Sequence, residues 1–291
     1  MSINIPAPEE FFGHQLGADR KLAHWNKIVD YFWELDKSPM VKVEDLGKST
    51  EGNPFLLAII SSEENMVRLE EIREMSWKLA HPKNVPQEEI DQILENGVAV
   101  VSMSMSIHAT EVGGTQMAPE LAYELITLPM NKETLDNTVL LMFPCFNPDG
   151  QIMVTEFYEK YLGTEYEGTS PPMLYHKYTG HDNNRDAIHN NMVESKMVSK
   201  ALYLEWSPQA YIDFHHMGSY GARFYIAPFA NPIDDKVDPL IWTEQELYGG
   251  LTHVMLEQEG KYGIESTATY PGEFMPTFNY VPCWHNICVM L

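Results

Sequence analysis

Apolar and polar positions change their spacing along the N-terminal part of the chain. Between positions 20 and 37 the large apolar side chains recur about every 3.6 residues, which predicts an amphipathic helix. Residues 41–46 alternate like a half-buried strand, and residues 55–60 form a short apolar run of strand length. Turn-forming residues separate these two runs. This region therefore predicts a helix followed by a β-hairpin.

The middle of the chain predicts a buried parallel sheet. Residues 98–105 and 138–143 are continuous apolar runs, and residues 116–127 between them have a helical pattern. Strand, helix and strand in this order are typical of a parallel pair that is covered by helices. Residues 64–95 predict two charged surface helices with a loop near Pro82.

The C-terminal part continues the alternation of strands and helices. We expect helices over residues 192–205 and 242–260, and strands over residues 210–214 and 223–226. Residues 158–180 have no clear period and predict a long surface loop. Loops of that length often contribute to function.

Length and charge limit the class of protein. The chain has 291 residues, which suits one large α/β domain, and a formal net charge of −23. Such acidity argues against a nucleic-acid partner, because binding to phosphates needs clustered Lys and Arg. No apolar run is long enough to predict a membrane span. We expect the three cysteines to be free, buried thiols: Cys145, Cys283 and Cys288.

The N-terminal residues lack the basic and apolar segments of a signal peptide. The cytoplasm is therefore the default location for the chain as given, and export stays open. The oligomeric state is also open.

A candidate metal site begins at His108 and Glu111. They follow an apolar strand and precede Gly113-Gly114 and a helix, so they stand at the carboxyl end of a strand, where α/β sites are built. Hydrolytic zinc sites usually take three protein ligands, and two His with one Glu is a common set. The third ligand should end another buried strand, and either His215 or His216 fits that position.

Four motifs in this order resemble the zinc metallocarboxypeptidases of the carboxypeptidase A type, especially their large bacterial members. They are His-x-x-Glu at 108–111, Asn-Pro-Asp-Gly at 147–150, Asp-Asn-Asn-Arg at 182–185 and Asp-x-His at 213–215. The resemblance implies a mixed, mostly parallel eight-stranded sheet with helices on both faces. It also implies a single catalytic domain over residues 1–291.

The resemblance implies that His108, Glu111 and His215 bind Zn²⁺, with His216 as a neighbour. Carboxypeptidase A is itself the standard example of this ligand set, so the set follows from the resemblance and not from an independent derivation. Asp182 matches the acid that accepts a hydrogen bond from the ligand histidine and fixes its tautomer.

Substrate-binding residues follow in the same way. Asn184 and Arg185 match the pair that binds the terminal carboxylate of the substrate, a task that suits the guanidinium fork. The alternative is a structural ion pair of Arg185 with Asp182 or Asp186. Residues 147–150 match no catalytic role, and we interpret them as a tight turn beside the site.

The implied function is a zinc-dependent metallocarboxypeptidase. It would hydrolyse a peptide bond near a free C-terminal carboxylate through a zinc-bound water, and its partner would be a peptide with a free C-terminus. Tyr270 stands about where the family keeps a mobile tyrosine over the substrate, with Tyr280 as the competing residue.

The chain departs from the family pattern in two places. No Arg lies between Gly150 and Asn184 to polarise the scissile carbonyl, which leaves Lys177 or Arg223 as substitutes. In addition, the family's general-base Glu belongs beyond the third ligand, at the end of a late strand, where this sequence has no acid. We therefore expect a domain that is incomplete at its C-terminus, and we disfavour Glu265 and Glu273 as the base.

Two other functions stay open. One is a zinc amide hydrolase of the same fold that acts on acylated amino acids or cell-wall peptides. The other is a catalytically silent zinc-binding domain, which the missing Glu and Arg favour.

Overall fold

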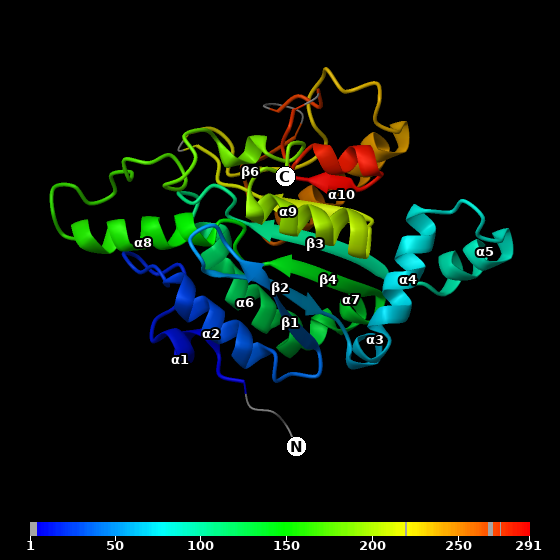
Figure 1. Ribbon diagram of the computed structural model, residues 1–291, viewed down its shortest axis with the longest axis horizontal. Coiled ribbons are helices and arrows are strands. Elements are labelled where there is room, and N and C mark those ends of the chain that lie inside the picture. Colours follow the sequence, from blue (N-terminus) through cyan, green and yellow to red (C-terminus); the bar gives the residue numbers. More distant parts are fainter. Residues whose placement is uncertain (1–4, 219, 267–269, 274) are drawn as a thin grey trace.

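The computed structural model describes residues 5–218, 220–266, 270–273 and 275–291. Its centre is a sheet of six strands in the order β1-β2-β4-β3-β5-β8 (Figure 1). A separate small sheet pairs β6 with β7. The strands are β1 (Val41–Lys48), β2 (Pro54–Ile60), β3 (Ala99–Met105), β4 (Thr138–Phe143), β5 (Ala210–Phe214), β6 (Phe224–Tyr225), β7 (Ile264–Glu265) and β8 (Cys288–Met290).

The sheet is antiparallel at one side and parallel at the other. β1 and β2 form the predicted hairpin, and β2 pairs antiparallel with β4. The pairs β3–β4, β3–β5 and β5–β8 are all parallel. The expected mixed, mostly parallel class is therefore confirmed. The expected eight strands are not found in one sheet, because β6 and β7 are short and pair with each other.

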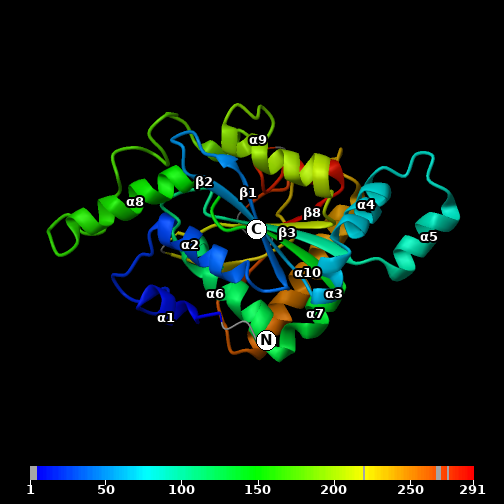
Figure 2. The ribbon, with the colours of Figure 1, turned by 60° about the horizontal axis from the view of Figure 1, so that its bottom comes forward.

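Helices cover both faces of the central sheet (Figures 1 and 2). The α-helices are α1 (Pro8–Phe12), α2 (Trp25–Leu35), α3 (Glu63–Val67), α4 (Leu69–Ala80), α5 (Gln87–Asn96), α6 (Gly113–Thr127), α7 (Lys132–Asn137), α8 (Pro148–Tyr161), α9 (Val193–Lys200) and α10 (Pro239–Gln258). Short 3-10 helices span Pro129–Asn131, Asn183–Arg185 and Val281–His285, and a π-helix spans Ala201–Trp206.

Two sequence-based interpretations were wrong. Residues 63–96 form three helices instead of two, because α3 ends at Val67 and Arg68 separates it from α4. Residues 147–150 begin a helix instead of a tight turn. Asn147 is the N-cap of α8, its side chain accepts the amide hydrogen of Gly150, and Pro148 occupies the first turn.

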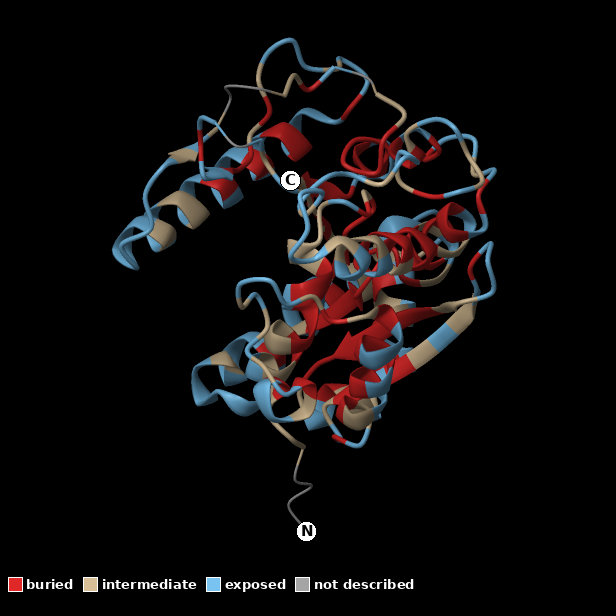
Figure 3. Cartoon of the chain, turned by 90° about the vertical axis from the view of Figure 1, so that its left-hand side faces the viewer, coloured by how far each residue is buried: buried red, intermediate tan, exposed pale blue. Residues whose placement is uncertain are grey.

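The core has two layers, one on each face of the sheet. Successive side chains of β2 point to opposite faces of the sheet. One apolar cluster contains Phe55, Leu57 and Ile59, and the other contains Leu56, Ala58 and Ile60. The first cluster includes residues of α4, α9 and α10, and the second includes residues of α2 and α6. Figure 3 shows the buried residues concentrated along the strands between these helices. A sheet that is buried on both faces explains the continuous apolar runs of the sequence.

No helix in the described ranges is long and apolar enough to cross a membrane. The three cysteines are free and buried, as expected.

Candidate metal centre

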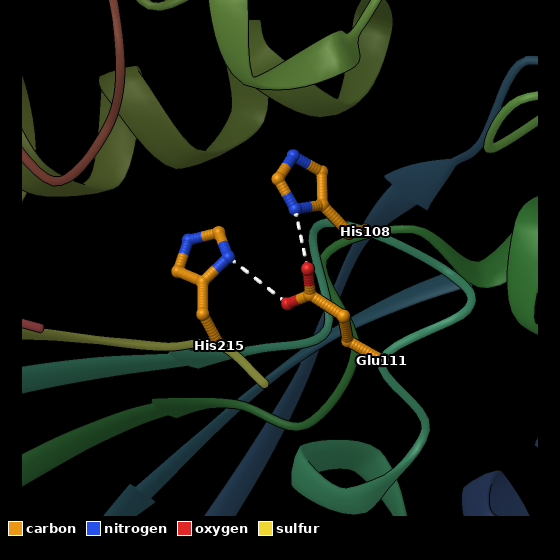
Figure 4. A group of neighbouring side chains, drawn as sticks. All are labelled: His108, Glu111 and His215. Carbon is orange, nitrogen blue, oxygen red and sulfur yellow. Dashed lines mark hydrogen bonds and ion pairs between the residues drawn. The ribbon is translucent and has the colours of Figure 1, made fainter. Parts of the chain in front are cut away.

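Three side chains that the sequence places in distant segments meet at the carboxyl edge of the sheet. His108 Nδ1 lies 2.8 Å from one oxygen of Glu111, and His215 Nδ1 lies 3.0 Å from the other (Figure 4). The ligand atoms of these three residues all lie within 4.8 Å of one another. The arrangement can hold a metal ion between two nitrogens and a carboxylate.

The strands bring these residues together. β3 and β5 are adjacent and parallel, and Met105 at the end of one pairs with Phe214 at the end of the other. His215 follows β5 directly, and His108 lies in the loop between β3 and α6. That loop is fastened by Ser106, whose hydroxyl donates to the backbone carbonyl of Glu111 over 2.8 Å.

Each histidine is held from its other side by an aspartate. His108 Nε2 lies 2.9 Å from Asp182, and His215 Nε2 lies 2.9 Å from Asp213. Asp213 is fully buried and accepts a further hydrogen bond from the Ser104 hydroxyl. An aspartate at Nε2 favours the tautomer that leaves Nδ1 as the metal-binding nitrogen.

The contacts between the imidazole rings and the carboxylates are compatible with a bound cation. Both nitrogens of His108 and both nitrogens of His215 face carboxylate oxygens. A neutral imidazole has one N–H, so it satisfies one of its two carboxylates, and the other contact needs a second proton or a metal ion. Two imidazole nitrogens and one carboxylate are a donor set that zinc accepts.

The charges shift the pKa values of this cluster. Burial alone would raise the pKa of Glu111, but hydrogen bonds from His108 and His215 outweigh it and lower the pKa. Burial would lower the pKa of His215, but the buried Asp213 carboxylate and Glu111 raise it to about 10. The pKa of His108 is raised in the same way by Asp182 and Glu111. In the metal-free protein the cluster therefore favours imidazolium rings beside carboxylates.

His216 has a supporting position at the same loop. Its backbone N–H donates to Glu111 over 2.9 Å, and its ring Nε2 accepts the amide hydrogen of Gly113 over 2.8 Å. A Cβ at Gly113 would lie 2.3 Å from that nitrogen, so a larger residue there would displace the His216 ring. The ring of His216 thus contacts the start of α6.

Asn184 and Arg185 lie beside the cluster, and each already has a partner within the protein. Asn184 is buried and accepts the backbone N–H of Phe278 over 2.9 Å, while its amide nitrogen lies 3.4 Å from His215 Nε2. Arg185 forms an ion pair with Asp182 over 3.2 Å, and its side chain is 45% exposed. Nearly half of this side chain is therefore accessible to solvent, while Nη1 also donates to the backbone carbonyl of Asn184 over 2.7 Å.

A cavity of about 560 Å³ opens beside His215 and is lined mainly by apolar side chains. Tyr270 and Arg223 line this cavity. Lys177, the other suggested cation, lies 3.3 Å from Glu51 in an ion pair. Of the two cations, Arg223 is therefore the one that shares a cavity with the cluster.

The carboxylates that contact the two histidines are Glu111, Asp182 and Asp213, as far as the described residues show. Each of them is paired with a ring nitrogen. Glu265 lies in β7 with an exposed side chain, and Glu273 is exposed as well.

Sequence reasoning missed two contacts of the site. The ring of Tyr175 stacks on His108, with 4.3 Å between the ring centroids and 19° between the ring planes. The second is the contact of Asp213 with His215. The sequence motif used Asp213 only to identify His215, although an Asp two residues before a histidine at a strand end can itself orient that ring.

Comparisons with known proteins agree with this geometry. A family model for zinc carboxypeptidases matches residues 28–280. The chain belongs to the zinc carboxypeptidase family. This membership confirms the family resemblance of the sequence motifs. A comparison with curated protein sequences found no match.

Solved structures of carboxypeptidases have the same fold. The carboxypeptidase A of Helicoverpa armigera is 14% identical with a TM-score of 0.57, and the alignment covers 93% of this chain and 66% of that one. A putative carboxypeptidase of Burkholderia mallei is 14% identical with a TM-score of 0.59, covering 91% and 57%. A putative carboxypeptidase A of Shewanella denitrificans is 14% identical with a TM-score of 0.58, covering 91% and 58%. The chain thus spans less than two thirds of the length of these three proteins.

Proposed function

We propose that this chain binds zinc through His108, Glu111 and His215 and belongs to a peptidase that removes residues from free peptide C-termini. The observation that supports this most is the pair of imidazole rings, each placed between two carboxylates. When bound, zinc would act as a Lewis acid on a carbonyl oxygen and lower the pKa of a coordinated water.

The chain's own residues would orient the substrate. The side chain of Arg185 is 45% exposed, and a guanidinium whose Nη1 is paired with Asp182 can still donate from its other nitrogens to a terminal carboxylate. The apolar cavity beside His215 would receive the side chain of the terminal residue, with Tyr270 on its wall. Arg223 on the same cavity would stabilise negative charge on the carbonyl oxygen.

In the proposed reaction, proton transfer limits the rate of peptide hydrolysis. Glu111, Asp182 and Asp213 are each paired with a histidine, so none of them is free to act as general base. Loss of a general base typically costs about a hundredfold to ten-thousandfold in rate. We therefore expect this chain to bind zinc and substrate and to turn substrate over slowly.

The test combines zinc content with hydrolysis of a blocked dipeptide that has a free C-terminus. His108→Ala and His215→Ala should each lose zinc and the residual hydrolysis, and the exposed His189→Ala should keep both. The same dipeptide with an amidated C-terminus should react more slowly in the parent chain. Zinc retained in both alanine variants would contradict the proposed ligands.

The same measurements separate the two alternatives. Faster hydrolysis of an N-acylated amino acid than of the dipeptide would indicate an amide hydrolase that acts on small substrates. Zinc binding without hydrolysis of either compound, in this chain, would favour a silent zinc-binding domain.

A further inference from the structure

The Asn147–Gly150 segment has no catalytic role in the mechanism above, yet its contacts surround His108. Asn147 is buried, and its amide nitrogen donates to the carbonyl of Ile107 over 3.2 Å and to the carbonyl of Tyr175 over 3.0 Å. Ile107 precedes His108 in the chain, and Tyr175 stacks on its ring. One buried amide group therefore links the backbone of the histidine to its stacking partner.

Gly150, in the first turn of α8, lies against the same residues. A Cβ at this position would lie 2.0 Å from the carbonyl oxygen of Tyr175 and 2.6 Å from the Cβ of Ala109. A side chain would therefore push against Tyr175 and against the residue that follows His108. Only glycine permits this approach.

Asp149 anchors the same segment to the β1–β2 hairpin. It is buried and accepts hydrogen bonds from the backbone N–H of Glu51 over 2.9 Å and from the amide of Asn53 over 2.7 Å. It also accepts a hydrogen bond from the Ser49 hydroxyl. The start of α8 is thus held to the sheet on one side and to the His108 loop on the other.

We propose that Asn147 and Gly150 are positioning residues for His108, which act on the metal site through Ile107, Ala109 and Tyr175. The hydrogen bonds of the Asn147 side chain and the close contacts at Gly150 involve Ile107, Ala109 and Tyr175 and not the side chains of the three proposed ligands. The inference rests on the proposed zinc site. Outer contacts of this kind typically change metal affinity by about 10- to 100-fold.

Asn147→Asp separates positioning from helix capping. An aspartate still accepts the amide hydrogen of Gly150 and still caps α8, but it no longer donates to the two carbonyls. Asn65→Asp is a matched control, because Asn65 is also buried and its amide donates to the carbonyls of Leu135 and Asp136. Both variants replace a buried donor with a carboxylate that faces two carbonyl oxygens.

The experiment compares the two variants in zinc affinity, in the visible spectrum of the Co²⁺-substituted protein and in thermal unfolding. Both variants should unfold at lower temperature than the parent chain. Only Asn147→Asp should weaken zinc binding by about 10- to 100-fold and alter the Co²⁺ spectrum. Equal loss of zinc affinity in both variants, or parent-like binding in Asn147→Asp, overturns the proposal.

A second pair of variants decides the matter if Asn147→Asp does not fold. Tyr175→Ala removes the stacked ring from a surface loop, and Tyr166→Ala removes a ring from the same loop that is 53% exposed. Tyr175→Ala should weaken zinc binding and change the Co²⁺ spectrum, whereas Tyr166→Ala should leave both unchanged. If Tyr175→Ala behaves like the parent chain, the stacked tyrosine does not position His108 and the proposal fails.

The metal-free protein gives a readout that does not depend on the proposed function. The ring proton resonances of His108 report the stacked ring of Tyr175 in nuclear magnetic resonance spectra. They should shift in Asn147→Asp and stay in place in Asn65→Asp. If the parent chain binds no zinc, the proposed function fails, and these resonances still test the positioning of His108.

Discussion

His215 lies 3.0 Å from Glu111 although 104 positions separate them in the chain. The contact exists because β3 and β5 are neighbouring parallel strands, so the segments that leave their carboxyl ends meet at one edge of the sheet. Glu111 is also contacted by His108, and this one carboxylate therefore joins the two histidines. The geometry of the metal centre depends on the register between these two strands.

The aspartates behind the histidines should control metal affinity. Asp213→Asn and Asp182→Asn each remove the charge that holds the Nε2 hydrogen of a ligand ring. We expect each variant to bind zinc about 10- to 100-fold more weakly, as measured by competition with a coloured chelator. Asp235→Asn, with a side chain that is 86% exposed, serves as the control. Unchanged affinity in both the Asp213 and the Asp182 variant would contradict the proposed ligand orientation.

Zinc should stabilise the folded chain. A ligand that binds only the folded state at about one hundred times its dissociation constant adds about 2.7 kcal/mol to the free energy of unfolding. Thermal unfolding with added zinc and with a chelator measures this difference. In His215→Ala the gain should disappear, because the variant removes one of three ligands. A zinc-dependent shift that survives this substitution would place the metal elsewhere.

Local spacing revealed the parts of the site that are close in sequence. His108 and Glu111 follow an apolar strand at a short interval, so the sequence identifies them, whereas the end of the next strand fitted both His215 and His216 and only the family resemblance favoured His215. Tyr175 was not found, because its stacking on His108 depends on the path of a long loop without a period. Sequence alone does not determine how such a loop packs.

Helix α8 shows a different limit of prediction from the sequence. Asn147, Pro148 and Gly150 have the composition of a turn, and the sequence was interpreted in that way. Yet Asn as N-cap followed by Pro in the first turn is also a helix start, and the structure has that arrangement. The apolar period after Pro148 is weak, since the buried face of α8 includes the polar Gln151 and Thr155 beside Met153 and Val154. The expectation that residues 1–291 form one incomplete domain stays a prediction.

The pH dependence of stability should include a contribution from His176. This side chain is buried, its Nδ1 accepts the amide hydrogen of Thr179 over 3.2 Å, and burial lowers its pKa below the usual 6.5. Above about pH 6.5 both folded and unfolded states hold it neutral, so stability is complete. As the pH falls from there through the folded pKa, the unfolded state binds the proton first and the free energy of unfolding decreases.

His176→Asn tests this contribution, because an asparagine oxygen can accept the same hydrogen bond without titrating. Denaturant unfolding of the metal-free chain between about pH 5 and pH 8 should give a shallower decrease for the variant than for the parent. The exposed His189→Asn should follow the parent curve. Identical pH dependence in His176→Asn and the parent would show that His176 titrates alike in both states.

The cavity beside His215 should favour substrates with an apolar C-terminal residue. Besides Arg223 and the two histidines, which we place beside the reacting carbonyl and the metal centre, its wall includes Ile212, Phe214 and Leu256, which offer no partner for a charged side chain. Leu256→Asp places a carboxylate on this wall, so we expect the preference to move from C-terminal Phe toward C-terminal Lys by about tenfold or more in kcat/KM. Leu251→Asp is the control, because Leu251 lies on the same helix, is 54% exposed and does not line the cavity. If turnover is too slow to compare, competition by Phe and Lys as free amino acids gives the same order. An equal shift in both variants would show that the added charge acts at long range and that the cavity does not receive the terminal side chain.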